Sequence, residues 1–115
     1  SGAALMYPRV VHERIGGWDE GFFLFSEDVD FCKRVHEAGL RVMYVPDARV
    51  YHAIGISARP STRAIIERHR SMWHYYRKHV RRTWIQDVFT APVIAGRCGI
   101  ALRDECFQPR DEDLR

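Results

Sequence analysis

The sequence predicts a small α/β domain with short strands and a long C-terminal helix. Short apolar runs end at Pro8 and Pro46, which is typical of strands that lead into turns. Longer segments place apolar residues at helical spacing and end at glycines, which is typical of amphipathic helices. The 115 residues are 46% hydrophobic and 29% charged, a composition that suits one globular domain.

Composition also excludes several classes of protein. Aromatic residues make up 12% of the chain, too many for a disordered or collagen-like sequence. The three cysteines form no C-x-x-C pair, which argues against a disulfide framework or a zinc ribbon and indicates a reducing compartment. The first seven residues lack the charged start and long apolar run of a signal peptide and do not begin with Met. We therefore expect that processing or truncation produced this N-terminus.

The first half of the chain predicts three short strands and two helices. Residues 3–7 form an apolar run that ends at Pro8, the pattern of a buried strand. A short helix is expected over residues 10–15, stopped by Gly16 and Gly17. A second helix is expected to start at residues 26–28, where a Ser or Asp side chain can cap it, and to end at Gly39. Two more strands follow, over residues 41–45 and 49–52, with a turn between them at residues 46–47.

The second half predicts a long helix and a less regular apolar segment. Ser61 is a suitable N-cap for a helix that reaches residue 82, and Ile65, Trp73 and Tyr76 lie on one side of it. Residues 84–102 are mostly apolar, but Asp87, Pro92, Arg97 and two glycines interrupt them. We expect a core-packing or interfacial helix there rather than a membrane span. Residues 103–115 are expected to be a solvated, charged tail that includes an acidic run at residues 111–113.

Charge is distributed unevenly, and it divides the chain into three parts. Residues 1–58 precede a basic amphipathic helix over residues 59–82, and a C-terminal helical segment with its charged tail occupies residues 83–115. The middle part holds seven arginines and one lysine against a single acidic residue, Glu67. Such a stretch implies an anionic neighbour, namely phosphate, acidic lipid or nucleic acid, or else a solvated helix face.

Three carboxylates gather at the start of the second helix. Glu27, Asp28 and Asp30 lie within four residues, so their mutual repulsion requires helix amides, an arginine or a cation nearby. Arg34 follows Asp30 by four residues and is expected to pair with it along the helix. Either one carboxylate stays free to accept a proton as a general base, or the three form a capping cluster with a surface ion pair.

Other candidate site residues carry similar alternatives. His52 ends a predicted strand, where it either binds a metal ion or fills a structural position. The loop at residues 18–20 (Trp, Asp, Glu) either binds a sugar or forms a tight turn. His69, His74 and His79 are five residues apart, which does not place them on one helix face, so a three-histidine metal site is disfavoured.

These motifs occur in a specific order along residues 1–82. Together they resemble the C-terminal half of family 2 glycosyltransferases with the GT-A (Rossmann-like) fold, and most closely the bacterial rhamnosyltransferases of cell-surface polysaccharide synthesis. The order is carried by Ile15-Gly16-Gly17-Trp18-Asp19-Glu20-Gly21-Phe22-Phe23, Glu27-Asp28-Val29-Asp30-Phe31-Cys32 with Arg34, Ala38-Gly39-Leu40, Val45-Pro46-Asp47-Ala48 and Tyr51-His52. The fold class implied is a partial GT-A domain.

The resemblance implies an inverting transfer of a sugar, rhamnose in the nearest relatives, from a nucleotide-diphosphate sugar to a hydroxyl of a glycan or lipid-linked acceptor. Asp28 is then the general base, and His52 helps to coordinate a divalent cation, Mg²⁺ or Mn²⁺, on the donor diphosphate. The basic helix contacts diphosphate or the inner face of the cell membrane from the cytoplasm, through Arg70 and Lys78. The residues expected to bind the acceptor are Trp18, Asp19, Glu20, Glu27 and Asp30.

The part of the family pattern that binds the nucleotide does not occur in this sequence. We therefore expect a fragment that is inactive alone, with self-association as a further expectation. The alternative from another class is a non-catalytic module that binds polyanions, nucleic acid or acidic lipid, through the basic helix and the aromatic residues Trp73, Tyr75 and Tyr76. The glycosyltransferase resemblance, by contrast, implies no nucleic-acid partner. Salt-dependent polyanion binding that is indifferent to Asp28 would distinguish the alternative.

Overall fold

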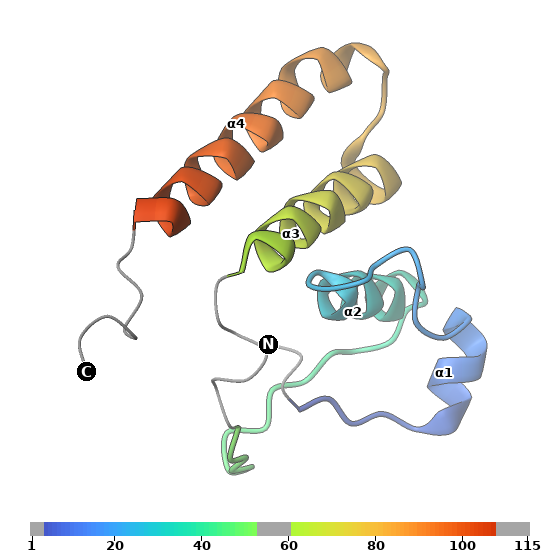
Figure 1. Ribbon diagram of the computed structural model, residues 1–115. Helices are drawn as coiled ribbons and strands as arrows, with labels where there is room; N and C mark the ends of the chain where they lie inside the picture. Colours follow the sequence, from blue (N-terminus) through green and yellow to red (C-terminus); the bar gives the residue numbers. More distant parts are fainter. Residues whose placement is uncertain (1–3, 53–60, 108–115) are drawn as a thin grey trace, which may run out of the picture. The chain divides into compact units, whose positions relative to one another are not determined.

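The computed structural model describes residues 4–52 and 61–107, and every regular element within them is helical. The chain divides into two compact units, Ser1–Arg59 and Pro60–Arg115. The first unit contains α1 (Arg9–Ile15) and α2 (Glu27–Glu37), as Figure 1 shows. The second contains α3 (Thr62–Tyr75), a π-helical turn η1 (Tyr76–Val80) and α4 (Ile85–Phe107). The boundary expected at residues 82 and 83 falls within the second unit, between η1 and α4.

Both helices of the first unit end at the predicted glycines. Gly16 follows α1 with a φ of 79°, in the left-handed region that glycine enters without steric cost. After α2, Gly39 has a φ of 76°, and its N–H donates to the carbonyl of His36 at 3.0 Å. The N–H of Leu40 donates to the carbonyl of Val35 at 3.1 Å, which completes a Schellman motif. The predicted helix stops are therefore confirmed.

α2 starts where predicted, but a serine cap does not form. Ser26 precedes the helix, but its side chain makes no capping hydrogen bond. A capping serine needs extended backbone so that its hydroxyl can turn back to the first free N–H groups. Ser26 instead has a φ of 66° and a ψ of −3°, and Phe25 before it also has a φ of 66°. Two consecutive left-handed residues that are not glycine make this a strained entry into α2.

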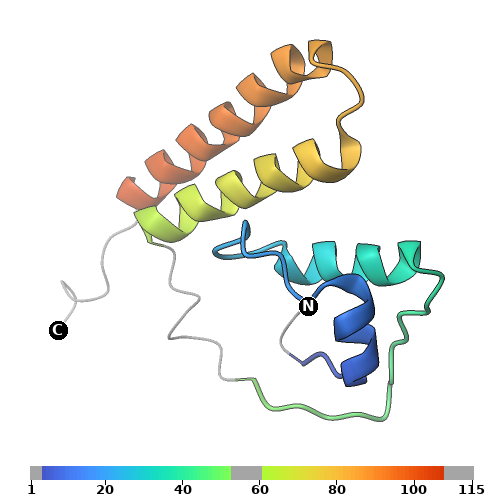
Figure 2. The same ribbon diagram turned by 90° about the vertical axis from the view of Figure 1, so that its right-hand side faces the viewer.

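The three predicted strands are not confirmed, because the described residues 4–52 and 61–107 contain no strand. Residues 4–8 and 40–52 run as single extended segments; the second is the green connection that leaves α2 in Figure 2. A strand requires a neighbouring strand to pair with its N–H and C=O groups, and these segments have none beside them. Met6 is almost fully exposed, so the expectation of a buried first strand is also wrong. The turn at residues 46–47 does form.

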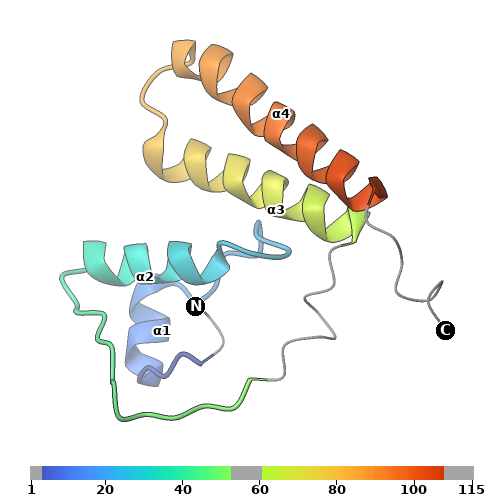
Figure 3. The same cartoon turned by 90° about the vertical axis from the view of Figure 1, so that its left-hand side faces the viewer.

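The second unit is a helical hairpin. The Ser61 hydroxyl accepts a hydrogen bond from the N–H of Ala64 at 3.1 Å, which confirms the predicted cap of α3. α4 runs antiparallel to α3 (Figures 1 and 3), and the Thr62 hydroxyl at the start of α3 lies 3.4 Å from a Glu105 carboxylate oxygen near the end of α4. α4 therefore packs on α3 as expected. It continues five residues into the segment predicted as a tail, and residues 108–115 lie outside the described part of the chain.

The core of the first unit is small and is centred on α2. Phe31 and Val35 of α2 and Phe22 of the preceding loop are its buried apolar side chains, with exposed fractions of 2%, 7% and 7%. Asp30 lies beside Phe31 in the sequence and is fully buried. A charged side chain at the centre of so small a core must be compensated by a partner.

Candidate functional site

A buried ion pair joins α2 to the end of α1. The Nε of Arg34 donates to Oδ2 of Asp30 at 2.8 Å, which confirms the predicted i, i+4 pair. The same guanidinium donates from Nη1 to the carbonyls of Ile15 at 2.9 Å and Gly17 at 2.7 Å. The Ile15 carbonyl lies in the last turn of α1 and the Gly17 carbonyl directly follows the helix, where backbone acceptors lack helical partners. Arg34 therefore fixes the Gly16-Gly17 turn against α2 as well as compensating Asp30.

An aromatic cluster holds the loop that follows this turn. The Trp18 ring stacks on Phe31 with ring centroids 4.4 Å apart, and the Trp18 indole N–H donates to the Tyr7 hydroxyl at 3.0 Å. The Tyr7 ring in turn lies 4.6 Å from Phe31 and stacks on His12 at 6.1 Å. Tyr7 lies in the first predicted strand, and its sequence context predicts no role for it at the loop. Its position directly before Pro8 was the only signal that this residue borders a change of direction.

The loop itself forms the tight turn that was one of its two predicted alternatives. Oδ1 of Asp19 accepts a hydrogen bond from the N–H of Gly21 at 2.8 Å, and the Asp19 carbonyl accepts one from the N–H of Phe22 at 3.1 Å. Glu20 is exposed at the tip, and Trp18 keeps 39% of its surface exposed. The turn therefore presents one carboxylate and part of an indole ring at the surface.

The three carboxylates at the start of α2 occupy different environments. Asp30 has no exposed surface and is bound to Arg34, so it contacts no acceptor as it stands. Asp28 is partly exposed, and its Oδ1 accepts a hydrogen bond from the N–H of Val29 at 2.9 Å. Oε2 of Glu27 is buried and has no hydrogen-bond partner among the described residues. All three lie in the first turn, where the helix dipole stabilises negative charge.

The remaining predicted residues are not gathered at this point. His52 is exposed at the end of the described part of the first unit. Arg70 and Lys78 are exposed on α3 and η1, and Arg70 pairs with Glu67 of its own helix at 3.2 Å. Among residues 4–52 and 61–107, no group of three His, Cys, Asp or Glu side chains is close enough to hold a metal ion. These residues therefore do not by themselves form a complete cation site.

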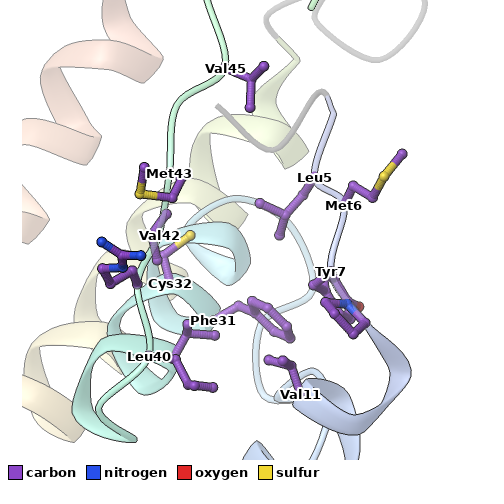
Figure 4. A pocket seen from close by; sticks show the side chains of 13 residues that line it. Leu5, Met6, Tyr7, Val11, Phe31, Cys32, Leu40, Val42, Met43 and Val45 are labelled. Atoms are coloured by element: carbon purple, nitrogen blue, oxygen red, sulfur yellow. The ribbon is translucent and has the colours of Figure 1, made fainter.

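A cavity of about 860 Å³ lies elsewhere in the first unit, between the two extended segments. Figure 4 shows Leu5 of the first segment, Val42 of the second and Phe31 of α2 around it. Its walls are mostly apolar, and no carboxylate is among the residues that line it. A sugar acceptor needs polar partners for its hydroxyl groups, so the carboxylate cluster, and not this cavity, is the candidate site.

Comparison with known proteins identifies the family. The family described as "Glycosyltransferase like family 2" matches residues 1–83, which include the carboxylate cluster and the Trp18 loop. The chain belongs to glycosyltransferase-like family 2. Membership implies a GT-A-like fold, although the short strands expected for it do not form in the described residues. α4 begins at Ile85 and lies beyond the matched residues of this family 2 chain.

Curated relatives of this family 2 chain are rhamnosyltransferases. One, "N-acetylglucosaminyl-diphospho-decaprenol L-rhamnosyltransferase" of Mycobacterium tuberculosis, is 42% identical over 52 residues, which are 45% of this chain and 17% of the relative. "Rhamnosyltransferase WbbL" of Escherichia coli K12 is 46% identical over 41 residues, 36% of this chain and 14% of the relative. The match thus spans less than a fifth of either relative. No solved structure matches the chain at a significant level.

Proposed function

We propose that this chain carries the acceptor-side, base-supplying part of a glycosyltransferase that moves a sugar, with inversion, from a nucleotide-diphosphate donor to an acceptor hydroxyl. Family membership and the names of the relatives support sugar transfer. The relatives' names also support rhamnose as the sugar and a lipid-linked acceptor. The reaction takes place in the cytoplasm, at the inner face of the cell membrane.

The observation that carries the proposal is the contrast between Asp28 and Asp30. Two carboxylates two residues apart have different surroundings, because Asp30 is buried in its ion pair with Arg34 while Asp28 is partly exposed. Neighbouring carboxylates in different surroundings take different roles. Asp30 is a positioning residue that fixes α2, and Asp28 is the carboxylate that can meet a substrate hydroxyl.

The proposed step is a displacement at the anomeric carbon of the donor sugar. The acceptor oxygen attacks the anomeric carbon of the donor and forms the new glycosidic C–O bond. The bond between that carbon and the diphosphate oxygen breaks, and its electron pair leaves with the nucleotide diphosphate. The Asp28 carboxylate takes the acceptor proton as the oxygen attacks. Attack from the side opposite the leaving group inverts the anomeric configuration.

The other predicted residues support this step without taking part in it. Trp18, Asp19 and Glu20 border the acceptor, and Glu27, which is partly exposed, helps to orient it. His52 is proposed as one ligand of a divalent cation. Arg70 and Lys78 are proposed to contact the donor diphosphate or the membrane.

The test uses the complete gene product that contains these 115 residues. Asp28→Asn keeps the size of the side chain and an oxygen for the Val29 N–H but removes the base. We expect kcat to fall by about 10²- to 10⁴-fold while nucleotide-sugar binding, measured by calorimetry, stays unchanged. Asp47→Asn makes the same chemical change at an exposed aspartate of the same unit and should leave kcat unaltered.

Turnover retained in Asp28→Asn, or lost equally in Asp47→Asn, would remove Asp28 from the role of base. His52→Ala addresses the cation separately. It should raise the metal concentration needed for half-maximal activity, and an unchanged metal requirement would return His52 to a structural role.

A further inference from the structure

α4 has two apolar faces, of which α3 covers only one. The inner face contributes Ala91, Ile94 and Cys98 to a small cavity of about 290 Å³, which they share with Ile66 and Trp73 of α3. The outer face remains open to solvent. Its exposed apolar side chains, called the α4 stripe below, are Ile85, Val88, Phe89, Val93 and Ile100, with exposed fractions of 54%, 58%, 72%, 62% and 62%.

We propose that the α4 stripe binds to the surface of a bilayer that contains anionic lipids, with α4 lying in the plane of the membrane. Ile85, Phe89 and Val93 follow one another at spacings of four, and Ile100 comes seven residues after Val93, so they share one face of the helix. Val88, next to Phe89, lies at the edge of this face. Between Ile85 and Ile100 the helix rises about 22 Å, at about 1.5 Å per residue. A continuous apolar patch of this length on a small protein marks a contact surface.

The charges around the stripe favour an anionic membrane over another apolar surface. Arg82 is exposed just before α4, and Arg97 and Arg103 are exposed on it. Trp84, at the start of the helix, is 69% exposed. Tryptophan prefers the boundary between lipid headgroups and hydrocarbon, and arginines are attracted to acidic headgroups. An apolar stripe accompanied by arginines and an indole is the arrangement found in interfacial helices.

Length and composition alone would also allow α4 to cross a membrane. The segment Ile85–Cys106 has a window of mean hydropathy 1.2, and the helix has 23 residues. Packing argues against a span, because α3 lies along α4 and carries Arg63, Glu67 and Arg70. A spanning α4 would draw these charges to the depth of the hydrocarbon, which is strongly unfavourable. An in-plane α4 leaves α3 on the aqueous side, where Arg70 is available to the donor diphosphate rather than to the membrane.

Two of the three acidic residues of α4, Asp87 and Glu105, agree with this orientation, whereas the third, Asp104, is exposed next to Arg103. A carboxylate oxygen of Asp87 lies 3.0 Å from Nε of Arg81 in the turn before α4. A carboxylate oxygen of Glu105 lies 3.4 Å from the Thr62 hydroxyl of α3. Both side chains therefore turn away from the stripe, so they do not oppose an anionic surface. The inference extends the proposed function, which already places the reaction at the membrane, but its evidence comes from α4, outside the residues that match the family.

The experiment measures sedimentation of the 115-residue chain with lipid vesicles. Vesicles of phosphatidylcholine alone are compared with vesicles of equal parts phosphatidylcholine and phosphatidylglycerol. We expect binding to the second kind only, released by alkaline carbonate as for a surface-bound protein. Val93→Asp should weaken that binding at least about tenfold, because an ionised carboxylate is unfavourable among acyl chains and near acidic headgroups. Val10→Asp makes the same change at a valine of α1 that is 66% exposed, and it should bind as the unchanged chain does.

A second measurement does not depend on a disruptive substitution. Brominated lipids should quench the tryptophan fluorescence of the bound chain, and Trp84→Phe should remove most of that quenching without changing the helical circular dichroism. Equal binding of Val93→Asp and Val10→Asp, equal binding to both kinds of vesicle, or resistance to carbonate would each overturn the proposal. So would a dimer in lipid-free solution that Val93→Asp dissociates, since the stripe would then be a contact between copies of the chain.

Discussion

Arg34 and Asp30 form an ion pair that is almost completely removed from solvent. Nε of Arg34 lies 2.8 Å from Oδ2 of Asp30, and the two side chains have exposed fractions of 17% and 0%. The guanidinium also donates to two carbonyls at the end of α1, so a single side chain links α1, the Gly16-Gly17 turn and α2. Since few apolar residues are buried in this unit, the orientation of the first turn of α2 depends heavily on this one link.

Replacement of Arg34 by alanine should destabilise α2 severely. The change leaves the Asp30 carboxylate buried without its partner and two carbonyls without their donor. Loss of one member of a buried pair typically costs about 3–5 kcal/mol. We expect the free energy of opening of α2, measured by amide hydrogen exchange in the 115-residue chain, to fall by that amount.

The control for this variant is an exposed pair on the same helix. Lys33 and Glu37 lie 2.6 Å apart with side chains 33% and 53% exposed. Lys33→Ala removes a pair with the same i, i+4 spacing and should change the same free energy by less than about 0.5 kcal/mol. Equal losses in the two variants would mean that burial of the Asp30–Arg34 pair contributes nothing.

The sequence predicted this ion pair but not the further hydrogen bonds of Arg34 to the end of α1. Spacing along a helix is a local property, so an aspartate and an arginine four residues apart were sufficient to predict the contact. The hydrogen bonds from Arg34 to the carbonyls of Ile15 and Gly17 depend on how α1 packs on α2. A local sequence pattern does not predict that packing. For the same reason the helix ends at Gly16 and Gly39 were predictable, because each glycine answers a local need for a left-handed backbone.

The predicted strands do not form in the described residues, because a strand depends on contacts that are not local in the sequence. Residues 41–45 have strand-like composition, but a strand exists only when another strand pairs with it. Ser26 does not cap α2 because its backbone is left-handed and strained. Composition gives no sign of such strain. The candidate site shows the same division. The carboxylate cluster was visible in the sequence, while the different burial of Asp28 and Asp30 emerged only from the structure.

The left-handed backbone at Ser26 predicts that glycine is more stable than alanine at this position, the reverse of their order inside a helix. With a φ of 66°, alanine keeps the steric penalty of the left-handed region, whereas glycine does not. Thermal unfolding should therefore show Ser26→Gly to be more stable than Ser26→Ala by about 1 kcal/mol. His36, exposed within α2, provides the reference position. At that position His36→Ala should be more stable than His36→Gly by a similar amount. If alanine were the more stable residue at both positions, the strain assigned to Ser26 would be contradicted.

Three glycine-to-alanine variants should form a graded series. Gly17→Ala combines a φ of 75° with a methyl group placed 2.9 Å from Nε2 of His12, so it should destabilise the chain most. Gly16→Ala has a similar φ but meets no atom within 4 Å, so it should lose only about 1–2 kcal/mol. Gly96→Ala lies inside α4 with open space around it and should stabilise that helix by about 0.5–1 kcal/mol. Any other order in the melting temperatures would contradict this reading of the turn.

The hydrogen bond between Trp18 and Tyr7 predicts a measurable coupling. Tyr7→Phe removes the hydroxyl that accepts the indole N–H at 3.0 Å, and Trp18→Phe removes the donor while keeping an aromatic ring on Phe31. Each single change should cost about 0.5–1.5 kcal/mol of unfolding free energy, the usual net value of such a bond. Because both variants break the same bond, the double variant should cost less than their sum by about 0.5 kcal/mol or more. Strict additivity would show that the bond does not hold the loop. Tyr44→Phe removes a hydroxyl from a tyrosine that is 86% exposed and should leave the unfolding free energy unchanged.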